Sequence, residues 1–158
     1  MTPKTTQNIL VLCTGNSCRS QIMQAYLQHF ISEQLEKTNS LNVDYQVYSA
    51  GIETHGLNPN AVRVMDEDDI NISHHTSNHL DEYANLPFNW VVTVCNHARE
   101  QCPHFENATT NRAKKVHRSF PDPAGAEGSE VQVMNEFRKV RNMIKVFASD
   151  FVQHTLKF

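Results

Sequence analysis

The chain has 158 residues, of which 39% are hydrophobic and 20% are charged, and its formal net charge is -3 at pH 7. This length and composition predict one globular domain over residues 1–158, and the negative charge gives no support for nucleic-acid binding. No apolar run approaches the roughly 20 residues of a membrane-spanning helix, and no signal peptide is recognisable, so we expect a cytoplasmic protein that does not bind a membrane.

Predicted strands and helices alternate along the first half of the chain. The apolar run at residues 7–12 predicts a buried strand. Apolar side chains then recur at helical spacing over residues 23–35, which predicts a helix of about four turns that begins near Ser20. Asn39-Ser40 breaks this helix, and residues 45–49 form the second predicted strand.

The alternation continues in the second half. Asn58-Pro59 opens another helix, and the acidic run at residues 66–69 is expected to face solvent. Residues 89–94 predict a strand, and residues 113–117 predict a weaker one. Residues 120–128 contain two prolines and two glycines and therefore predict a loop.

Residues 133–151 carry apolar side chains at helical spacing and predict a long terminal helix. The whole pattern favours an α/β fold, an open parallel sheet with helices on both faces. Ligands in such folds bind beyond the carboxyl ends of the strands. Because Cys13 and Cys95 each follow a predicted strand, we expect them to meet at this edge of the sheet.

The loop after the first strand is the most informative segment, because its residues can hold a reactive thiol and an anion together. Backbone N–H groups, the start of the next helix and the Arg19 guanidinium would lower the pKa of Cys13 and favour the nucleophilic thiolate. The same groups would bind a tetrahedral oxyanion. The predicted oxyanion-binding residues are Thr14, Gly15, Asn16, Ser17, Cys18, Arg19 and Ser20.

Individual residues of this site have more particular expected parts. Gly15 permits backbone conformations that a Cβ resists, and Asn16 tolerates left-handed geometry and can brace the loop. Ser20 can form a hydrogen bond with the Cys13 sulfur. The departing oxygen of the oxyanion needs a proton donor, and Asp122, in a proline-stiffened loop after the last predicted strand, is our candidate. The alternative is a turn aspartate, because Asp-Pro is common in turns.

The remaining cysteines suggest redox chemistry. Cysteines in a reducing compartment are more often catalytic, metal-binding or redox-active than structural, although we interpret Cys18 as structural. Cys95, His97, Cys102 and His104 form a cluster, but its spacing does not match a zinc site, which usually pairs cysteines two to four residues apart. We therefore predict no metal site.

Together these motifs resemble the low-molecular-weight tyrosine phosphatase superfamily, and within it the thioredoxin-coupled arsenate reductases. The resemblance covers nearly the whole chain and implies a flavodoxin-like sheet of four strands. The cysteine loop is shared with the phosphatases, whereas the pair Cys95 and Cys102 is specific to the reductases. The resemblance rests on residues 13–20, 48–56, 72–77, 91–95, 102–103 and 122–124.

The resemblance implies reduction of arsenate to arsenite, with Cys13, Arg19, Asp122, Cys95 and Cys102 as catalytic residues. Cys13 attacks arsenate while Asp122 helps water or hydroxide to depart. Cys95 then forms a Cys13–Cys95 disulfide and arsenite leaves. Cys102 then converts the Cys13–Cys95 disulfide into a Cys95–Cys102 disulfide, which thioredoxin or a similar thiol reductant reduces. Phosphate and sulfate are expected to bind as analogues of arsenate.

The second disulfide sets a geometric condition. If the intervening segment is helical, Cys95 and Cys102 stand about 10 Å apart. Disulfide-linked Cα atoms lie within roughly 4.4–6.8 Å of each other. We therefore expect residues 96–105 to rearrange when the bridge forms.

Some relatives in the reductase family bind potassium beside the loop through Asn, Ser, Thr and two acidic side chains. Asn16, Ser49 and Thr76 match that pattern, but Gln24 and Asn78 stand where the acids would be. Loss of two carboxylates weakens attraction for a cation. We therefore expect no cofactor and no tightly bound potassium.

Two alternatives to a reductase remain. A low-molecular-weight protein tyrosine phosphatase would use the same loop, but family phosphatases place an aromatic residue after Asp-Pro, where this chain has Ala124. A redox sensor or metal-binding protein would use the cysteines without turnover. The sequence also leaves open whether thioredoxin or glutaredoxin with glutathione is the reductant.

Overall fold

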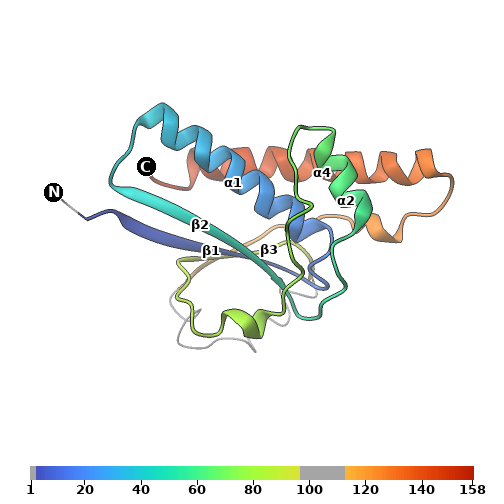
Figure 1. Cartoon of the computed structure of the whole chain (residues 1–158), viewed down its shortest axis with the longest axis horizontal. Helices are drawn as coiled ribbons and strands as arrows, with labels where there is room; N and C mark the ends of the chain where they lie inside the picture. Colours follow the sequence, from blue (N-terminus) through green and yellow to red (C-terminus); the bar gives the residue numbers. More distant parts are fainter. Residues whose placement is uncertain (1–2, 97–112) are drawn as a thin grey trace.

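The computed structural model describes residues 3–96 and 113–158 (Figure 1). Its strands are β1 (Thr5–Cys13), β2 (Val43–Gly51), β3 (Trp90–Thr93) and β4 (Lys114–His117). They form one parallel sheet of four strands in the order β2-β1-β3-β4. The predicted α/β fold with an open, four-stranded parallel sheet is therefore confirmed.

The helices are α1 (Arg19–Thr38), α2 (Pro59–Asp66) and α4 (Glu130–His154), with short 3₁₀ helices η1 (Leu80–Tyr83) and η3 (Pro123–Gly125). Figure 1 shows α1, α2 and α4 on one side of the sheet and η1 on the other. Because both faces are covered, the second half of β1 is buried without alternation from Ile9 to Cys13. None of the described helices is long and apolar enough to cross a membrane.

Local sequence explains where the helices begin and end. α1 ends at Asn39, whose φ of 50° is left-handed, as the predicted break requires. The Asn58 side chain accepts a hydrogen bond from the Asn60 backbone N–H and caps α2, with Pro59 in its first turn. Ser129 and Gln132 form a capping box at the start of α4.

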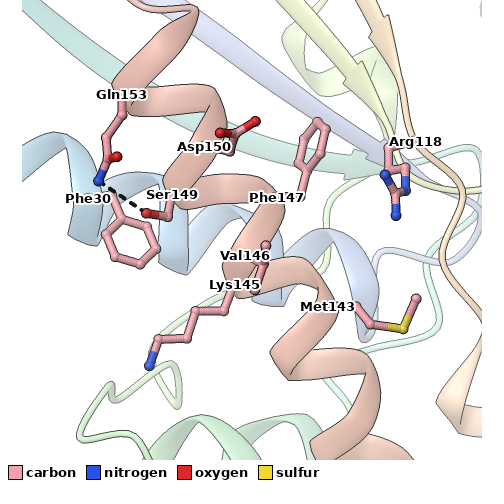
Figure 2. A pocket seen from close by; sticks show the side chains of 9 residues that line it. All are labelled: Phe30, Arg118, Met143, Lys145, Val146, Phe147, Ser149, Asp150 and Gln153. Atoms are coloured by element: carbon pink, nitrogen blue, oxygen red, sulfur yellow. Dashed lines mark hydrogen bonds between the residues drawn. The ribbon is translucent and has the colours of Figure 1, made fainter.

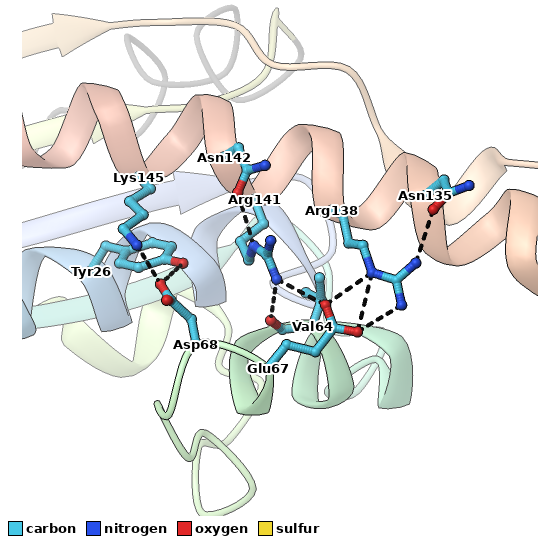
Figure 3. A network of polar contacts seen from close by, with 9 residues as sticks. All are labelled: Tyr26, Val64, Glu67, Asp68, Asn135, Arg138, Arg141, Asn142 and Lys145. Carbon is cyan, nitrogen blue, oxygen red and sulfur yellow. Dashed lines mark hydrogen bonds and ion pairs between the residues drawn. The ribbon is translucent and has the colours of Figure 1, made fainter.

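The acidic run after α2 is less exposed than the sequence predicts (Figure 3). Asp68 is half-buried and accepts hydrogen bonds from the Tyr26 hydroxyl at 2.7 Å and from Lys145 Nζ at 2.8 Å. Burial acts to raise the pKa of Asp68, but these two donors lower it below its ordinary value. The expectation of a solvent-facing run was wrong for Asp68 because α1 and α4 each supply a donor to it.

Glu67 forms the second half of this network (Figure 3). It accepts hydrogen bonds from Arg138 Nη2 at 2.7 Å and from Arg141 Nη1 at 3.0 Å. Arg141 Nη1 also donates to the Val64 backbone oxygen at 2.9 Å. These contacts fix the end of α2 on α4, so the loop before α2 is held at the same edge of the sheet as the carboxyl end of β1.

Candidate active site

The carboxyl ends of the two central strands bring two thiols together, as we expected. Leu12 lies opposite Thr93 in the sheet, so Cys13 and Cys95 follow at neighbouring positions. Cys95 is the largest cause of the raised pKa of Cys13, so the two thiols lie close together, and the Thr14 hydroxyl lies 3.2 Å from the Cys95 sulfur. Both cysteines are buried and no disulfide joins them, so they are a dithiol in this structure.

The loop from Thr14 to Cys18 turns its backbone carbonyl groups outward. The Thr14 oxygen accepts from the Glu53 N–H at 2.9 Å, and the Ser17 oxygen accepts from the Asn58 N–H at 3.1 Å. The Gly15 and Asn16 oxygens accept from the His55 N–H at 2.9 Å and from Gln21 Nε2 at 3.0 Å.

Most N–H groups of this loop, unlike its carbonyl groups, lack hydrogen-bond partners in the described part of the chain. Those of residues 15–19 donate to no acceptor within residues 3–96 and 113–158. Buried N–H groups are nearly always paired in folded proteins. A loop whose carbonyl groups are bonded on the outside and whose N–H groups are not bonded is suited to hold an anion on its inner side.

Arg19 completes the anion site. Its side chain is only 12% exposed, and Nη1 donates to the Phe120 backbone oxygen at 3.1 Å. Nη2 lies 3.6 Å from Asp122 Oδ2. Nε is buried and has no acceptor among the residues that the structure describes. An unpaired buried donor is unfavourable, and an oxyanion bound in the loop would supply the missing acceptor.

The position of Asp122 is compatible with both roles that the sequence left open, a turn aspartate and a proton donor. Its Oδ1 accepts from the Ala124 N–H at 3.0 Å and caps η3, which is the turn role. Its Oδ2 faces Arg19, and the side chain is 52% exposed. The carboxyl group therefore lies beside the anion site with access to water, as a proton donor requires.

Asn16 braces the loop as predicted. It is fully buried and left-handed, with φ of 49°. Its Nδ2 donates to Ser20 Oγ at 2.8 Å and to Ser49 Oγ at 3.0 Å, and its Oδ1 accepts from the Asn78 N–H at 2.7 Å. The hydrogen bond of Ser20 that the structure shows is thus to Asn16, and the expected bond to the Cys13 sulfur is not found.

Gly15 is required for a different reason from the one we predicted. Its φ is not positive, so it needs no left-handed freedom. A Cβ at Gly15 would instead collide with the ring of His55. Gly51 is also constrained, because its Cβ would lie 2.7 Å from the Thr14 oxygen and 2.8 Å from the Asn16 nitrogen. Sequence reasoning missed the contacts of residues 51–55 with the loop, although Gly51 at the end of a predicted strand was a signal of close packing.

The predicted lowering of the Cys13 pKa was wrong for this dithiol state. The hydrogen-bonded Cys95 thiol and burial raise the pKa of Cys13, while Arg19 and the Thr14 N–H act in the opposite direction. Sequence reasoning counted the cationic groups but not a second thiol in contact with the first. Burial also raises the pKa of Cys18 to about 11, which agrees with a structural thiol.

The residues of the expected potassium pattern do come together. Gln24, Ser49, Thr76 and Asn78 line a cavity of about 240 Å³. Ser49 Oγ donates to Gln24 Oε1 at 2.6 Å, and Thr76 Oγ1 donates to Asn78 Oδ1 at 2.7 Å. These groups are neutral and already pair with one another. Over the described ranges, no group of three or more His, Cys, Asp or Glu side chains is arranged to hold a metal.

Some predictions fall outside the described residues. His97, Cys102 and His104 belong to residues 97–112, so the predicted Cys95–Cys102 disulfide and nearly all of the segment that we expect to rearrange cannot be followed in the described residues. A cavity of about 580 Å³ along α4 is described but contains no predicted site residue (Figure 2). It is lined by Phe30, Arg118, Met143, Lys145, Val146, Phe147, Ser149, Asp150 and Gln153.

Comparison with known proteins finds one matching family and similar proteins that cover most of the chain. The profile of the low molecular weight phosphotyrosine protein phosphatase family matches residues 8–157. An arsenate reductase of Halalkalibacterium halodurans is 42% identical over 144 residues, covering 89% of this chain and 94% of the relative. An arsenate reductase of Staphylococcus aureus strain Newman is 42% identical over 151 residues, covering 96% and 98%.

Solved structures support the fold. A YwlE mutant from Bacillus subtilis superposes with a TM-score of 0.75 at 17% identity, covering 96% of this chain and 99% of the other. An arsenate reductase in the phosphate binding state gives a TM-score of 0.69 at 22% identity, covering 93% and 97%.

Proposed function

This chain belongs to the low molecular weight phosphotyrosine protein phosphatase family, and from this membership and the geometry of its loop we propose that it is an arsenate reductase. The proximity of Cys13 and Cys95 at the ends of two paired strands is the observation that carries the proposal. Hydrolysis of a phosphate ester by this kind of loop needs one thiol. Reduction of arsenate needs two electrons, and two thiols beside an anion site supply them.

The first step forms a covalent adduct. Arsenate binds to the inward N–H groups and to Arg19, and the Cys13 sulfur forms a bond to arsenic. One arsenic–oxygen bond breaks, and the departing hydroxide takes up the Cys13 proton and leaves as water. Asp122, 3.6 Å from Arg19, passes on this proton. This route is compatible with the raised pKa of Cys13, because its thiol proton is consumed in the same step.

The second step is the reduction. Cys95 attacks the Cys13 sulfur, so that a sulfur–sulfur bond forms and the sulfur–arsenic bond breaks. The electron pair of that bond stays on arsenic, an arsenite oxygen takes up the Cys95 proton, and arsenite leaves. The two thiols have lost two electrons and arsenic has gained them. Adjacent parallel strands are about 4.8 Å apart, so a Cys13–Cys95 disulfide is within reach.

The last steps restore the dithiol. Cys102 attacks Cys95, frees the Cys13 thiol and leaves a Cys95–Cys102 disulfide. A dithiol reductant of the thioredoxin class then reduces this bridge and is itself oxidised. A reducing cytoplasm supplies such a reductant, which is where we place the reaction.

The substitution Cys102→Ala tests this function. We expect one arsenite per protein chain and then no further turnover, with the Cys13–Cys95 disulfide trapped, because no thiol remains to resolve it. Mass spectrometry of peptides after arsenate treatment identifies the disulfide. Cys95→Ala is the matched control, and it should release no arsenite while Cys13 stays unpaired.

The same experiment addresses the second candidate function, a phosphatase. The anion loop with Arg19 and Asp122 favours hydrolysis of small aryl phosphates as a side activity. A phosphatase would keep full turnover of aryl phosphate in Cys102→Ala and would consume no arsenate. That result would contradict the proposed function.

A further inference from the structure

A histidine side chain contacts one residue on each side of Cys95 in the chain, Thr93 before it and Asn96 after it. His117 is the last residue of β4 and lies opposite Thr93 of β3. Its Nδ1 is 2.7 Å from the Thr93 hydroxyl, and its Nε2 is 3.3 Å from Asn96 Oδ1. One ring therefore contacts the chain both two residues before Cys95 and one residue after it.

The chemistry of the two partners fixes the ring. Asn96 Oδ1 can only accept, so His117 Nε2 carries the proton and donates to it. In the neutral ring Nδ1 then accepts from the Thr93 O–H. Thr93 is buried, so its hydroxyl needs a partner, and this hydrogen bond supplies one. Both ring nitrogens are thus used, and the orientation of the ring is determined.

In the described part of the chain, the backbone hydrogen bonds of the sheet hold the residue before Cys95. The Val94 N–H donates to the Leu12 oxygen at 3.0 Å, and the Val94 oxygen accepts from the Phe120 N–H at 3.1 Å. These backbone bonds reach Val94, the residue before Cys95. On the far side, the described hydrogen bond of Asn96 is the one to His117.

We propose that His117 is a positioning residue for Cys95, because it holds Thr93 and Asn96 together and so keeps the Cys95 thiol against Cys13. This inference rests on the proposed function, in which Cys95 must attack the Cys13 sulfur. His117 belongs to none of the sequence motifs described above, and its described hydrogen bonds go to Thr93 and Asn96, not to either thiol. His117 therefore acts on the alignment of the Cys95 sulfur with the Cys13 sulfur that it attacks, and small displacements of reacting atoms have large consequences for rate.

The test measures disulfide formation directly, without arsenate. In a Cys102→Ala background, the protein is equilibrated in glutathione buffers, where the dithiol and one glutathione disulfide give a Cys13–Cys95 disulfide and two glutathione thiols. We expect His117→Ala to lower this equilibrium constant about tenfold, the order expected for lost positioning hydrogen bonds. Peptide mass spectrometry confirms that Cys13–Cys95 is the bridge counted.

Conservative variants separate positioning from stability. His117→Asn keeps an acceptor for the Thr93 hydroxyl, and His117→Gln keeps a donor for Asn96, so each should recover part of the loss. His154→Ala is the matched control, because His154 is 70% exposed at the end of α4, and it should match the parent. Thermal unfolding shows which variants are folded. If His117→Ala does not fold, the equilibrium constants of the His117→Asn and His117→Gln variants test the proposal in its place.

Two results would overturn the inference. One is an equilibrium constant in folded His117→Ala equal to that of the parent. The other is a parallel loss of phosphate affinity, measured by calorimetry, which would mean that His117 acts on the whole site. Failure of the proposed function is a separate outcome, because a chain that reduces no arsenate still gives a defined Cys13–Cys95 equilibrium.

Discussion

At the scale of single residues, Asn16 determines the shape of the anion loop. Its left-handed φ of 49° reverses the backbone inside the loop, and its side chain donates two hydrogen bonds and accepts one. All three partners are on different segments of the chain, Ser20, Ser49 and Asn78. Because Asn16 is fully buried, any of these partners left unpaired would be shielded from water.

We predict that Asn16→Ala destabilises the chain by about 3 kcal/mol and abolishes phosphate binding, because it adds unpaired buried groups to a strained backbone. Asn39→Ala is the matched control. Asn39 is also left-handed, with φ of 50°, but it is exposed at the end of α1. The free energy of unfolding of Asn39→Ala should fall by about 1 kcal/mol, and its affinity for phosphate should be unchanged. Urea unfolding and calorimetry measure the two effects, and equal losses in both variants would contradict the role of the Asn16 side chain.

At the scale of elements, α1, β2 and the segment before η1 meet around the cavity lined by Gln24, Ser49, Thr76 and Asn78. Each of these elements contributes a neutral oxygen, and the oxygens are paired by hydrogen bonds at 2.6 Å and 2.7 Å. A cation here would have to break these bonds and would gain no carboxylate from them.

We therefore predict that arsenate reduction rates in potassium and in sodium chloride of equal ionic strength agree within about twofold. Rates are measured with saturating reductant, and thermal unfolding in the two salts provides a second readout that does not depend on turnover. A rate or a melting temperature that rises strongly with potassium alone would show that the neutral oxygens suffice to bind it.

The elements also show what a sequence can reveal. The periods of apolar residues located β1, α1, β2 and α4, since burial imposes those periods directly. The partners of Gly15 and Asp68 could not be predicted in this way. His55 and Lys145 reach them from other elements, and the packing of those elements is not encoded in local spacing. His117 was overlooked for the same reason, since its contacts depend on the register of β4 on β3.

At the scale of the whole molecule, the order of the strands makes the site. β1 and β3 are neighbours in the centre of the sheet although α1, β2 and α2 separate them in the chain. Strand alternation predicted a parallel sheet and the family resemblance implied four strands, but neither predicted that β1 pairs with β3. Thiols at the ends of these two strands were expected to meet, and this held because the register places Leu12 opposite Thr93.

The stability of the whole chain should depend on pH through Cys18. Its pKa is raised from 9.0 to about 11 by burial, so the unfolded chain loses this proton first as the pH rises. The free energy of unfolding therefore falls between pH 9 and pH 11, by about 2–3 kcal/mol from this group. Cys18→Ala lacks this contribution, so the stability difference between parent and variant should narrow over that interval.

Urea unfolding at a series of pH values measures this difference. Between pH 6 and pH 8 both states keep the Cys18 proton, and the difference should be constant there, which provides the internal control. A difference that stays constant up to pH 11 would mean that burial does not hold the Cys18 thiol neutral.

The outward carbonyl groups of the anion loop have a consequence for selectivity in the cell. A cradle of N–H groups recognises a tetrahedral anion by its charge and shape, and inorganic phosphate presents nearly the same charge and shape as arsenate. Phosphate should therefore occupy the loop most of the time and shield Cys13 from oxidants. In the proposed thiol relay, discrimination between the two anions falls to the second thiol, because phosphorus does not accept the electron pair that arsenic does. Phosphate is held and released unchanged, whereas arsenate is consumed.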